Sequence, residues 1–129
     1  MEQSQYLIDT NAVIDYLGKR MPNKGMDFMN TVINEIPNLS IIAKIELLGF
    51  NTVDEHYNLL LSFMNDASVF SLTDNIVDAT IDLRRKYKTK LPDAIIAATA
   101  MVNNMILITR NTDDFNGIEG LKLINPYKA

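Results

Sequence analysis

The sequence predicts an α/β fold, in which a mainly parallel sheet of four to five strands is covered by helices on both faces. Short apolar runs alternate along the chain with longer segments in which apolar residues recur at helical spacing. Parallel strands joined through helices produce this alternation. In addition, no Pro/Ser-rich linker, low-complexity stretch or internal repeat interrupts the 129 residues. We therefore expect one domain over residues 1–129.

The elements of the first half follow from apolar spacing and from the positions of Pro and Gly. Gly18 and Pro22 end the first helical segment and Pro37 ends the second, because neither residue type continues a helix well. We expect strands over 5–9 and 39–42, and helices over 11–20, 24–36, 43–50 and 53–65. The expected inward faces are Val13, Ile14 and Leu17, then Met26, Met29, Val32, Ile33 and Ile36, and later Leu59, Leu60 and Phe63.

The second half repeats the pattern of strand and helix. Asp74 is expected to cap a helix over 75–88, and Pro92 suits the first turn of a helix that reaches Asn103. The predicted inward face of the first of these helices is Ile76, Val77, Thr80, Ile81 and Tyr87. The predicted strands are 68–72, 105–109 and 121–124.

The composition limits the classes of protein that the chain can belong to. There is no cysteine, which excludes disulfides, thiolate-bound zinc, iron–sulfur clusters and cysteine nucleophiles. No apolar run approaches the roughly 20 residues of a membrane span, and the N-terminal MEQSQYLID lacks the features of a signal peptide. We therefore expect a cytoplasmic protein without a membrane partner. With 12 basic and 16 acidic residues, any binding of nucleic acid requires a local site.

Several enzyme classes lack their motifs in this chain. Neither GxGxxG nor GxxxxGK[ST] occurs, which disfavours dinucleotide enzymes and P-loop NTPases. A haloacid-dehalogenase-like phosphatase requires a second Asp two residues after the strand-end Asp9, where Asn11 stands. A receiver domain lacks a convincing combination of phosphoacceptor, acidic pair and late lysine.

Acidic residues recur next to the apolar segments. Asp9 ends the first strand, Asp93 lies in the first turn of an alanine-rich helix, and Asp113 and Asp114 follow the fourth strand. Glu46 interrupts an apolar stretch in which an unpaired carboxylate is costly. Taken singly, Asp9 and Asp114 are explained as helix caps and Asp93 as a helix-start acid. Ligands of parallel sheets collect at the carboxyl ends of the strands, and carboxylates gathered there are usually neutralised by Mg²⁺ or Mn²⁺.

Four stretches of the chain resemble the PIN domain, and more narrowly the VapC-type toxins of VapBC toxin–antitoxin pairs. They are IDTNAVIDYL, IAKIELLGF, LPDAIIAATA and LITRNTDDFNGIEGLKLINP, at residues 8–17, 42–50, 91–100 and 107–126. The resemblance implies a three-layer α/β/α sandwich and metal-dependent endoribonuclease activity. It also implies Mg²⁺ or Mn²⁺ as cofactor, RNA as substrate, a VapB-like antitoxin as partner, and a homodimer.

The same resemblance assigns roles to individual residues. The implied catalytic acids are Asp9, Glu46, Asp93 and Asp114, of which Asp9, Asp93 and Asp114 are metal ligands; Thr10, Asn11, Thr109 and Asn111 are implied supporting polar groups. The family places its fourth acid at either of two positions, here Asn111 and Asp114, with Asp113 a solvated turn residue. The number of metal ions therefore stays open. The alternative function is an inactive PIN module that binds RNA or a protein partner.

Three other features of the sequence need an interpretation. The run RRKYKTK over 84–90 is either a solvated helix end or a patch that contacts RNA phosphates through Arg84, Arg85, Lys86, Lys88 and Lys90. The single histidine, His56, is interpreted as a surface or interface residue. Met21, Met26 and Met29 belong either to the core or to a groove for the antitoxin.

Overall fold

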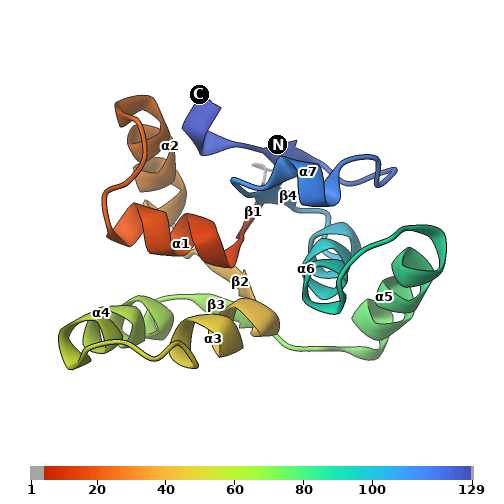
Figure 1. Ribbon diagram of the computed structural model, residues 1–129, viewed down its shortest axis with the longest axis horizontal. Helices are drawn as coiled ribbons and strands as arrows, with labels where there is room; N and C mark the ends of the chain where they lie inside the picture. Colours follow the sequence, from red (N-terminus) through yellow and green to blue (C-terminus); the bar gives the residue numbers. More distant parts are fainter. Residues whose placement is uncertain (1–4, 129) are drawn as a thin grey trace.

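The computed structural model describes residues 5–128, which form one five-stranded sheet with all neighbouring strands parallel (Figure 1). The strands lie in the order β3-β2-β1-β4-β5, so that β1 is central. This arrangement confirms the predicted α/β class and the upper end of the expected strand number. The strands are β1 (Tyr6–Ile8), β2 (Asn38–Ser40), β3 (Ser68–Phe70), β4 (Ile106–Ile108) and β5 (Leu123–Ile124).

Helices cover the sheet on both faces. In Figure 1, α5 and α6 lie to one side of the strands and α1 and α2 to the other. The helices are α1 (Thr10–Leu17), α2 (Asn23–Asn34), α3 (Ile41–Leu48), α4 (Asp54–Asn65), α5 (Asp74–Lys86), α6 (Leu91–Val102) and α7 (Thr112–Phe115), followed by the 3₁₀ turn η1 (Pro126–Lys128).

The two faces of the sheet belong to separate apolar clusters, because successive strand residues point to opposite faces. Leu7 of β1 packs in a cluster with residues of α5 and α6, whereas the next residue, Ile8, packs in a cluster with residues of α1, α2 and α3. Leu107 and Ile108 of β4 divide in the same way. The alternation holds helical layers against both faces and leaves the carboxyl ends of the strands as an edge where polar groups gather.

The alanine-rich helix α6 is the most deeply buried helix of the described chain. Every residue from Ala94 to Ala100 is buried, because small side chains let the helix approach the sheet and α5 closely. The one hydroxyl in this stretch, that of Thr99, donates to the carbonyl of Ile95 at 2.7 Å. None of the helices within residues 5–128 has the length and apolar character needed to cross a membrane.

Some predicted boundaries are wrong, and side-chain caps explain two of them. The strand predicted over 39–42 ends at Ser40, whose hydroxyl accepts a hydrogen bond from the amide of Ile42 and thereby starts α3 two residues early. Thr73, rather than Asp74, caps α5 by accepting from the amide of Ile76 at 3.4 Å. The helix predicted to reach residue 36 ends at Asn34.

Four side chains predicted to face inward are exposed instead. Ile36 lies beyond the end of α2, and in α4 and α5 the buried positions fall on narrower stripes that contain Met64 in α4 and Ile76, Thr80 and Leu83 in α5. Met21 and Met29 are buried and Met26 is half-buried, which favours the core interpretation for the first two. The exposed fractions of the four are 68% for Ile36, 47% for Leu59, 36% for Val77 and 51% for Ile81.

Candidate active site

Asp9 is the residue around which the candidate site is built. Its amide donates to the carbonyl of Ile108 at 2.9 Å, which holds it beside the end of β4. Its Oδ1 accepts from the amide of Thr10 at 2.8 Å and caps α1, and its Oδ2 accepts from the hydroxyl of Thr109 at 2.8 Å. The cap and the strand-edge interpretations are therefore both correct, and this carboxylate is only 6% exposed.

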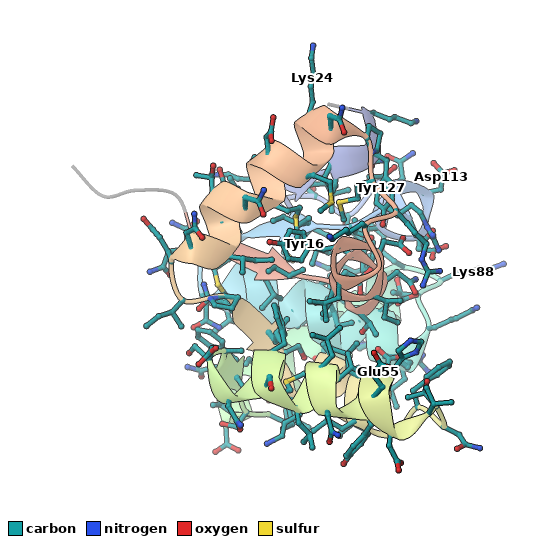
Figure 2. The ribbon with its side chains drawn as sticks, turned by 90° about the vertical axis from the view of Figure 1, so that its left-hand side faces the viewer. Tyr16, Lys24, Glu55, Lys88, Asp113 and Tyr127 are labelled. Atoms are coloured by element: carbon teal, nitrogen blue, oxygen red, sulfur yellow. The ribbon has the colours of Figure 1, made fainter. Side chains whose placement is uncertain are left out.

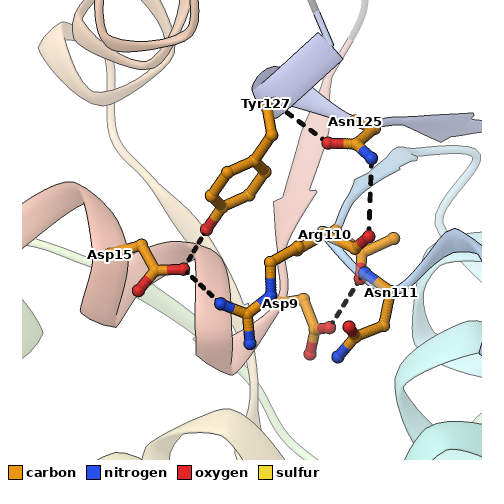
Figure 3. A network of polar contacts seen from close by, with 7 residues as sticks. Asp9, Asp15, Arg110, Asn111, Asn125 and Tyr127 are labelled. Atoms are coloured by element: carbon orange, nitrogen blue, oxygen red, sulfur yellow. Dashed lines mark hydrogen bonds and ion pairs between the residues drawn. The ribbon is translucent and has the colours of Figure 1, made fainter. Parts of the chain in front are cut away.

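Thr109 connects Asp9 to the loop that follows β4. Its side chain is fully buried, and its hydroxyl accepts from the amide of Asn111 at 3.0 Å while it donates to Asp9 (Figure 3). Hydrogen bonds on both sides leave the hydroxyl little freedom to rotate. The structure thus places Thr109 and Asn111 at the site, although Asn111 bonds here through its backbone.

Glu46 reaches the same site from α3. The hydroxyl of Thr10 donates to Oε1 of Glu46 at 2.6 Å and so links α3 to the residue that follows Asp9. The reason given for singling out Glu46 is nevertheless wrong, because its side chain is exposed. Its apolar neighbours Ile45 and Phe50 are 61% and 60% exposed, so the carboxylate is not enclosed by them and pays little desolvation.

Asp93 and Asp114 complete an electrostatic cluster with Asp9. Burial raises the pKa of Asp93, the charges of Asp114 and Asp9 raise it further, Lys90 opposes them, and Glu46 adds a smaller upward effect. Burial likewise raises the pKa of Asp9 against the hydrogen bonds from Thr109 and Thr10, and Glu46 and Asp114 add to the increase. The charges of Glu46 and Asp114 therefore act on both Asp9 and Asp93, although the four acids come from four different segments.

Two predicted or considered residues are not part of this arrangement. Asn11 is half-buried, and its side chain takes no part in the hydrogen bonds found among residues 5–128. Asp113 is exposed and is not among the charges that shift the pKa of Asp9 or Asp93. Of the acids after β4, Asp114 is the one that acts on the cluster.

The donors present suit a hard divalent cation in kind. All four acids offer carboxylate oxygens, which Mg²⁺ prefers, and Mg²⁺ usually retains several waters beside one or two protein carboxylates. In the part of the chain that is described, no three Asp, Glu or His side chains lie close enough together to form a complete set of ligands. Burial is the main cause of the raised pKa of Asp9 and of Asp93, and a bound cation would relieve the mutual repulsion that adds to it.

A second polar network, which sequence reasoning missed, lies beside the first (Figure 3). Nη1 of Arg110 pairs with Oδ2 of Asp15 at 3.0 Å, and the hydroxyl of Tyr127 donates to the same oxygen. Asn125 joins the network, since its Oδ1 accepts from the amide of Tyr127 and its Nδ2 donates to the carbonyl of Arg110. The signal in the sequence was weak: Asp15 follows Ala12 by three residues and so shares a face of the helix with it, a face that the structure buries.

The basic run lies at the end of α5 and in the loop that leads to Asp93. Arg84 is held locally, because its Nη1 donates to the carbonyl of Thr89 at 2.8 Å. Lys90 is close enough to Asp93 to oppose the increase in the pKa of that acid. The other three cations of the run, Arg85, Lys86 and Lys88, are also exposed. Outside the run, His56 is exposed too, in agreement with its interpretation as a surface residue.

The raised pKa of Asp93 predicts how the stability of the fold depends on pH. A carboxyl whose pKa is higher in the folded state favours folding while both states are protonated, below about its ordinary value of 3.8, and that contribution is lost as pH rises through the folded-state pKa. We therefore expect Asp93→Asn to raise Tm relative to the wild type at neutral pH, and this difference to shrink as pH falls toward 3.8. Thermal unfolding followed by circular dichroism at several pH values measures this; a difference that is constant with pH would contradict it.

Fold and site together define the class of protein: an α/β sandwich with a cluster of acids at the carboxyl edge of its parallel sheet. Comparison with family models matches the PIN domain over residues 6–121. The chain therefore belongs to the PIN domain family. A comparison with curated protein sequences finds no match.

Solved structures with the same fold include a toxin–antitoxin complex. A toxin-antitoxin complex from Klebsiella pneumoniae is 30% identical, with a TM-score of 0.78 and coverage of 95% of this chain and 98% of that one. FitAcB from Neisseria gonorrhoeae is 21% identical (TM-score 0.79; coverage 97% and 100%). VapBC2 from Rickettsia felis, bound to a DNA fragment from its promoter, is 22% identical (TM-score 0.76; coverage 93% and 97%). These neighbours are consistent with a VapC-type PIN domain.

Proposed function

We propose that the chain is a Mg²⁺- or Mn²⁺-dependent endoribonuclease and the toxin of a type II toxin–antitoxin pair. The observation that carries the proposal is the buried carboxylate of Asp9, whose pKa is raised by burial and by the charges of Glu46 and Asp114. Such a charge is costly unless the site exists to bind a cation. PIN domains of VapC-type systems are generally ribonucleases, which agrees with this chemistry.

The roles of the residues follow from their contacts. Asp9, Asp93 and Asp114 hold the cation, directly or through water, and Thr10 and Thr109 fix the orientation of the Asp9 carboxylate. When bound, the cation lowers the pKa of a water molecule and stabilises charge on the phosphate. The hydroxyl of Thr10 holds Glu46 by its Oε1, so that Glu46 orients or deprotonates the attacking water. Asn111 acts as a supporting group through its backbone bond to Thr109, whereas a supporting role for Asn11, whose side chain forms no hydrogen bond within residues 5–128, requires contacts with bound water or RNA.

We also propose a VapB-like antitoxin as partner and a homodimer as the assembly. The neighbouring structures include VapBC and FitAB complexes, and this chain exposes several large apolar side chains on and between α3 and α4, which suit a protein partner. The exposed apolar side chains are Ile45, Phe50, Val53 and Leu59. A cytoplasmic location stays a prediction.

The direct test is RNA cleavage by the purified chain, freed of any bound inhibitor and of contaminating nuclease. We expect cleavage with Mg²⁺ or Mn²⁺ and none in EDTA, with products that carry a 5′-phosphate and a 3′-hydroxyl. Absence of cleavage with both metals, by a folded protein that still binds RNA or an antitoxin, would favour the alternative of an inactive PIN module.

The basic run provides a second prediction. If its cations contact phosphates, replacing Arg85, Lys86 and Lys88 by Gln should weaken RNA binding and reduce the slope of log K against log salt by up to about 0.7 per lost contact. These three are chosen because Arg84 already bonds to a backbone carbonyl and Lys90 acts on Asp93. Fluorescence anisotropy with a labelled RNA at several salt concentrations measures the slope, and a slope equal to that of the wild type would leave the run as a solvated helix end.

A further inference from the structure

A pocket lies beside the candidate active site and shares residues with it. It encloses about 400 Å³, and its lining includes Arg110, Asn111, Asp114, Asn125, Tyr127 and Lys128. Its residues come from the loop after β4, from α7 and from the end of the chain after β5. Asp114 is one of the four clustered acids, and Asn111 bonds to the Thr109 that holds Asp9. Whatever occupies the pocket therefore lies next to the cluster.

Arg110 is held in a defined position at this pocket. The buried Asp15 accepts from its Nη1 at 3.0 Å, and the carboxylate is itself held by the Tyr127 hydroxyl. The guanidinium carbon lies 5.8 Å from the centroid of the Tyr127 ring, within the range of a cation–π contact. These contacts come from α1 and from η1, and η1 packs so closely on α2 that a Cβ on Gly25 would lie 2.1 Å from the carbonyl oxygen of Pro126.

The guanidinium keeps binding capacity after these contacts. Among the hydrogen bonds of residues 5–128, Arg110 uses only Nη1 of its side chain, and the side chain is 48% exposed. A guanidinium has five N–H donors in a planar fork that matches two oxygens of a phosphate. Fixing the fork in advance reduces the entropy lost when it binds an anion.

The charges of the pocket agree with a phosphate next to a metal site. Arg110 and Lys128 are its cations, whereas Asp113 and Asp114 are its acids. Asp114 belongs to the cluster that a divalent cation would neutralise. Asp113 is exposed to solvent, where its charge is screened by water and salt.

We propose that this pocket binds a phosphate of the RNA that flanks the one being cut, with Arg110 as the phosphate ligand and Asp15 and Tyr127 as its positioning residues. This inference rests on the proposed ribonuclease function, because the pocket shares Asp114 with the acid cluster. It assigns a role to a buried network that the proposed hydrolysis itself does not use.

The test variant is the double substitution Asp15→Asn/Arg110→Gln. It removes both charges of the pair, leaves the net charge unchanged and keeps two amides that can hydrogen-bond. Binding of a labelled single-stranded RNA is measured in EDTA, so that no RNA is cut, over a range of salt concentrations. We expect Kd to rise roughly tenfold, as for one lost charged contact, and the slope of log K against log salt to fall by about 0.7.

Lys24→Gln is the control, since the side chain of Lys24 projects from the start of α2 into solvent, away from Tyr127 (Figure 2), and does not line the pocket. Its slope and Kd should equal those of the wild type. Asp15→Asn alone keeps the Arg110 charge but frees the side chain, so we expect KM to rise severalfold while kcat and the salt slope are unchanged. A purely structural role for Asp15 would change Tm without this change in KM.

The outcomes separate this inference from the proposed function. If the wild type cleaves RNA and the double variant binds RNA with the same Kd and slope, the pocket is not a phosphate site. If the wild type does not cleave RNA but the double variant shows the reduced slope, the ribonuclease proposal fails and the phosphate site stands. If the double variant is unfolded, Arg110→Lys replaces it as the test variant. A severalfold rise in Kd at an unchanged slope then supports two-pronged binding of a phosphate by the Arg110 guanidinium, and an unchanged Kd overturns that proposal.

Discussion

Asp93→Asn is expected to reduce RNA cleavage by about a hundredfold or more, and at the same time to stabilise the fold. Replacing even an outer partner of a metal ligand typically costs about 10–100-fold, and Asp93 is proposed to hold the cation itself. The amide removes a charge that is disfavoured by burial and by Asp114 and Asp9. Loss of activity with a gain in stability is typical of residues selected for function.

The measurement combines three readouts on one pair of variants. Cleavage rates with Mg²⁺, Tm, and growth on induction of the chain are compared for Asp93→Asn and for Asp27→Asn. Asp27 is an exposed acid of α2 that forms no side-chain contact with the cluster, so its variant should match the wild type. We expect Asp93→Asn alone to relieve growth arrest. A variant that cleaves RNA at the wild-type rate would remove Asp93 from the catalytic residues.

Arg110→Ala is expected to lower the free energy of unfolding by about 3 kcal/mol, the lower end of the range for a broken buried ion pair. The side chain of Asp15 is 8% exposed, and without Arg110 its charge keeps, among residues 5–128, only the hydroxyl of Tyr127 as a partner. The lower end applies because the Arg110 side chain is itself 48% exposed, so water already screens part of the attraction. Urea unfolding of the metal-free protein measures the loss.

A double-mutant cycle distinguishes a broken pair from lost packing. Asp15→Asn/Arg110→Gln removes both charges and should lose less stability than Arg110→Ala, because no charged group is left buried without its counterion. The two single substitutions, Asp15→Asn and Arg110→Gln, complete the cycle and yield the coupling energy directly. A coupling energy near zero would mean that the pair contributes nothing to folding beyond the packing of its side chains.

The acids of the site differ in how far local sequence could locate them. Asp9 and Asp93 are placed by local rules, since one follows an apolar strand and the other lies in the first turn of a buried helix. The apolar neighbours of Glu46 predict a burial that does not exist, although Thr10 does bring Glu46 to the site. Its exposure depends on what packs against α3, and no spacing of residues within α3 contains that information.

The predicted helix faces failed for the same reason. Periodicity correctly placed Ile76 and Thr80 inside, yet it also assigned Val77 and Ile81 to the interior, where they are 36% and 51% exposed. An outer helix buries only the stripe that meets its neighbour, and the width of that stripe is set by the neighbour. The boundary of β2 was likewise decided by one hydroxyl, that of Ser40, which caps α3 at the residue where the strand ends.

The sequence by itself determined the alternation of strand and helix, and with it a parallel sheet whose carboxyl edge collects acids. Those features follow from local periodicity and from which residues begin a helix. Only the tertiary structure decided that Thr109 holds Asp9 from 100 positions away, and that Asp15 is paired with Arg110, 95 positions distant. Burial and hydrogen bonding at these residues depend on segments that meet only when the sheet forms, so a local pattern does not contain them.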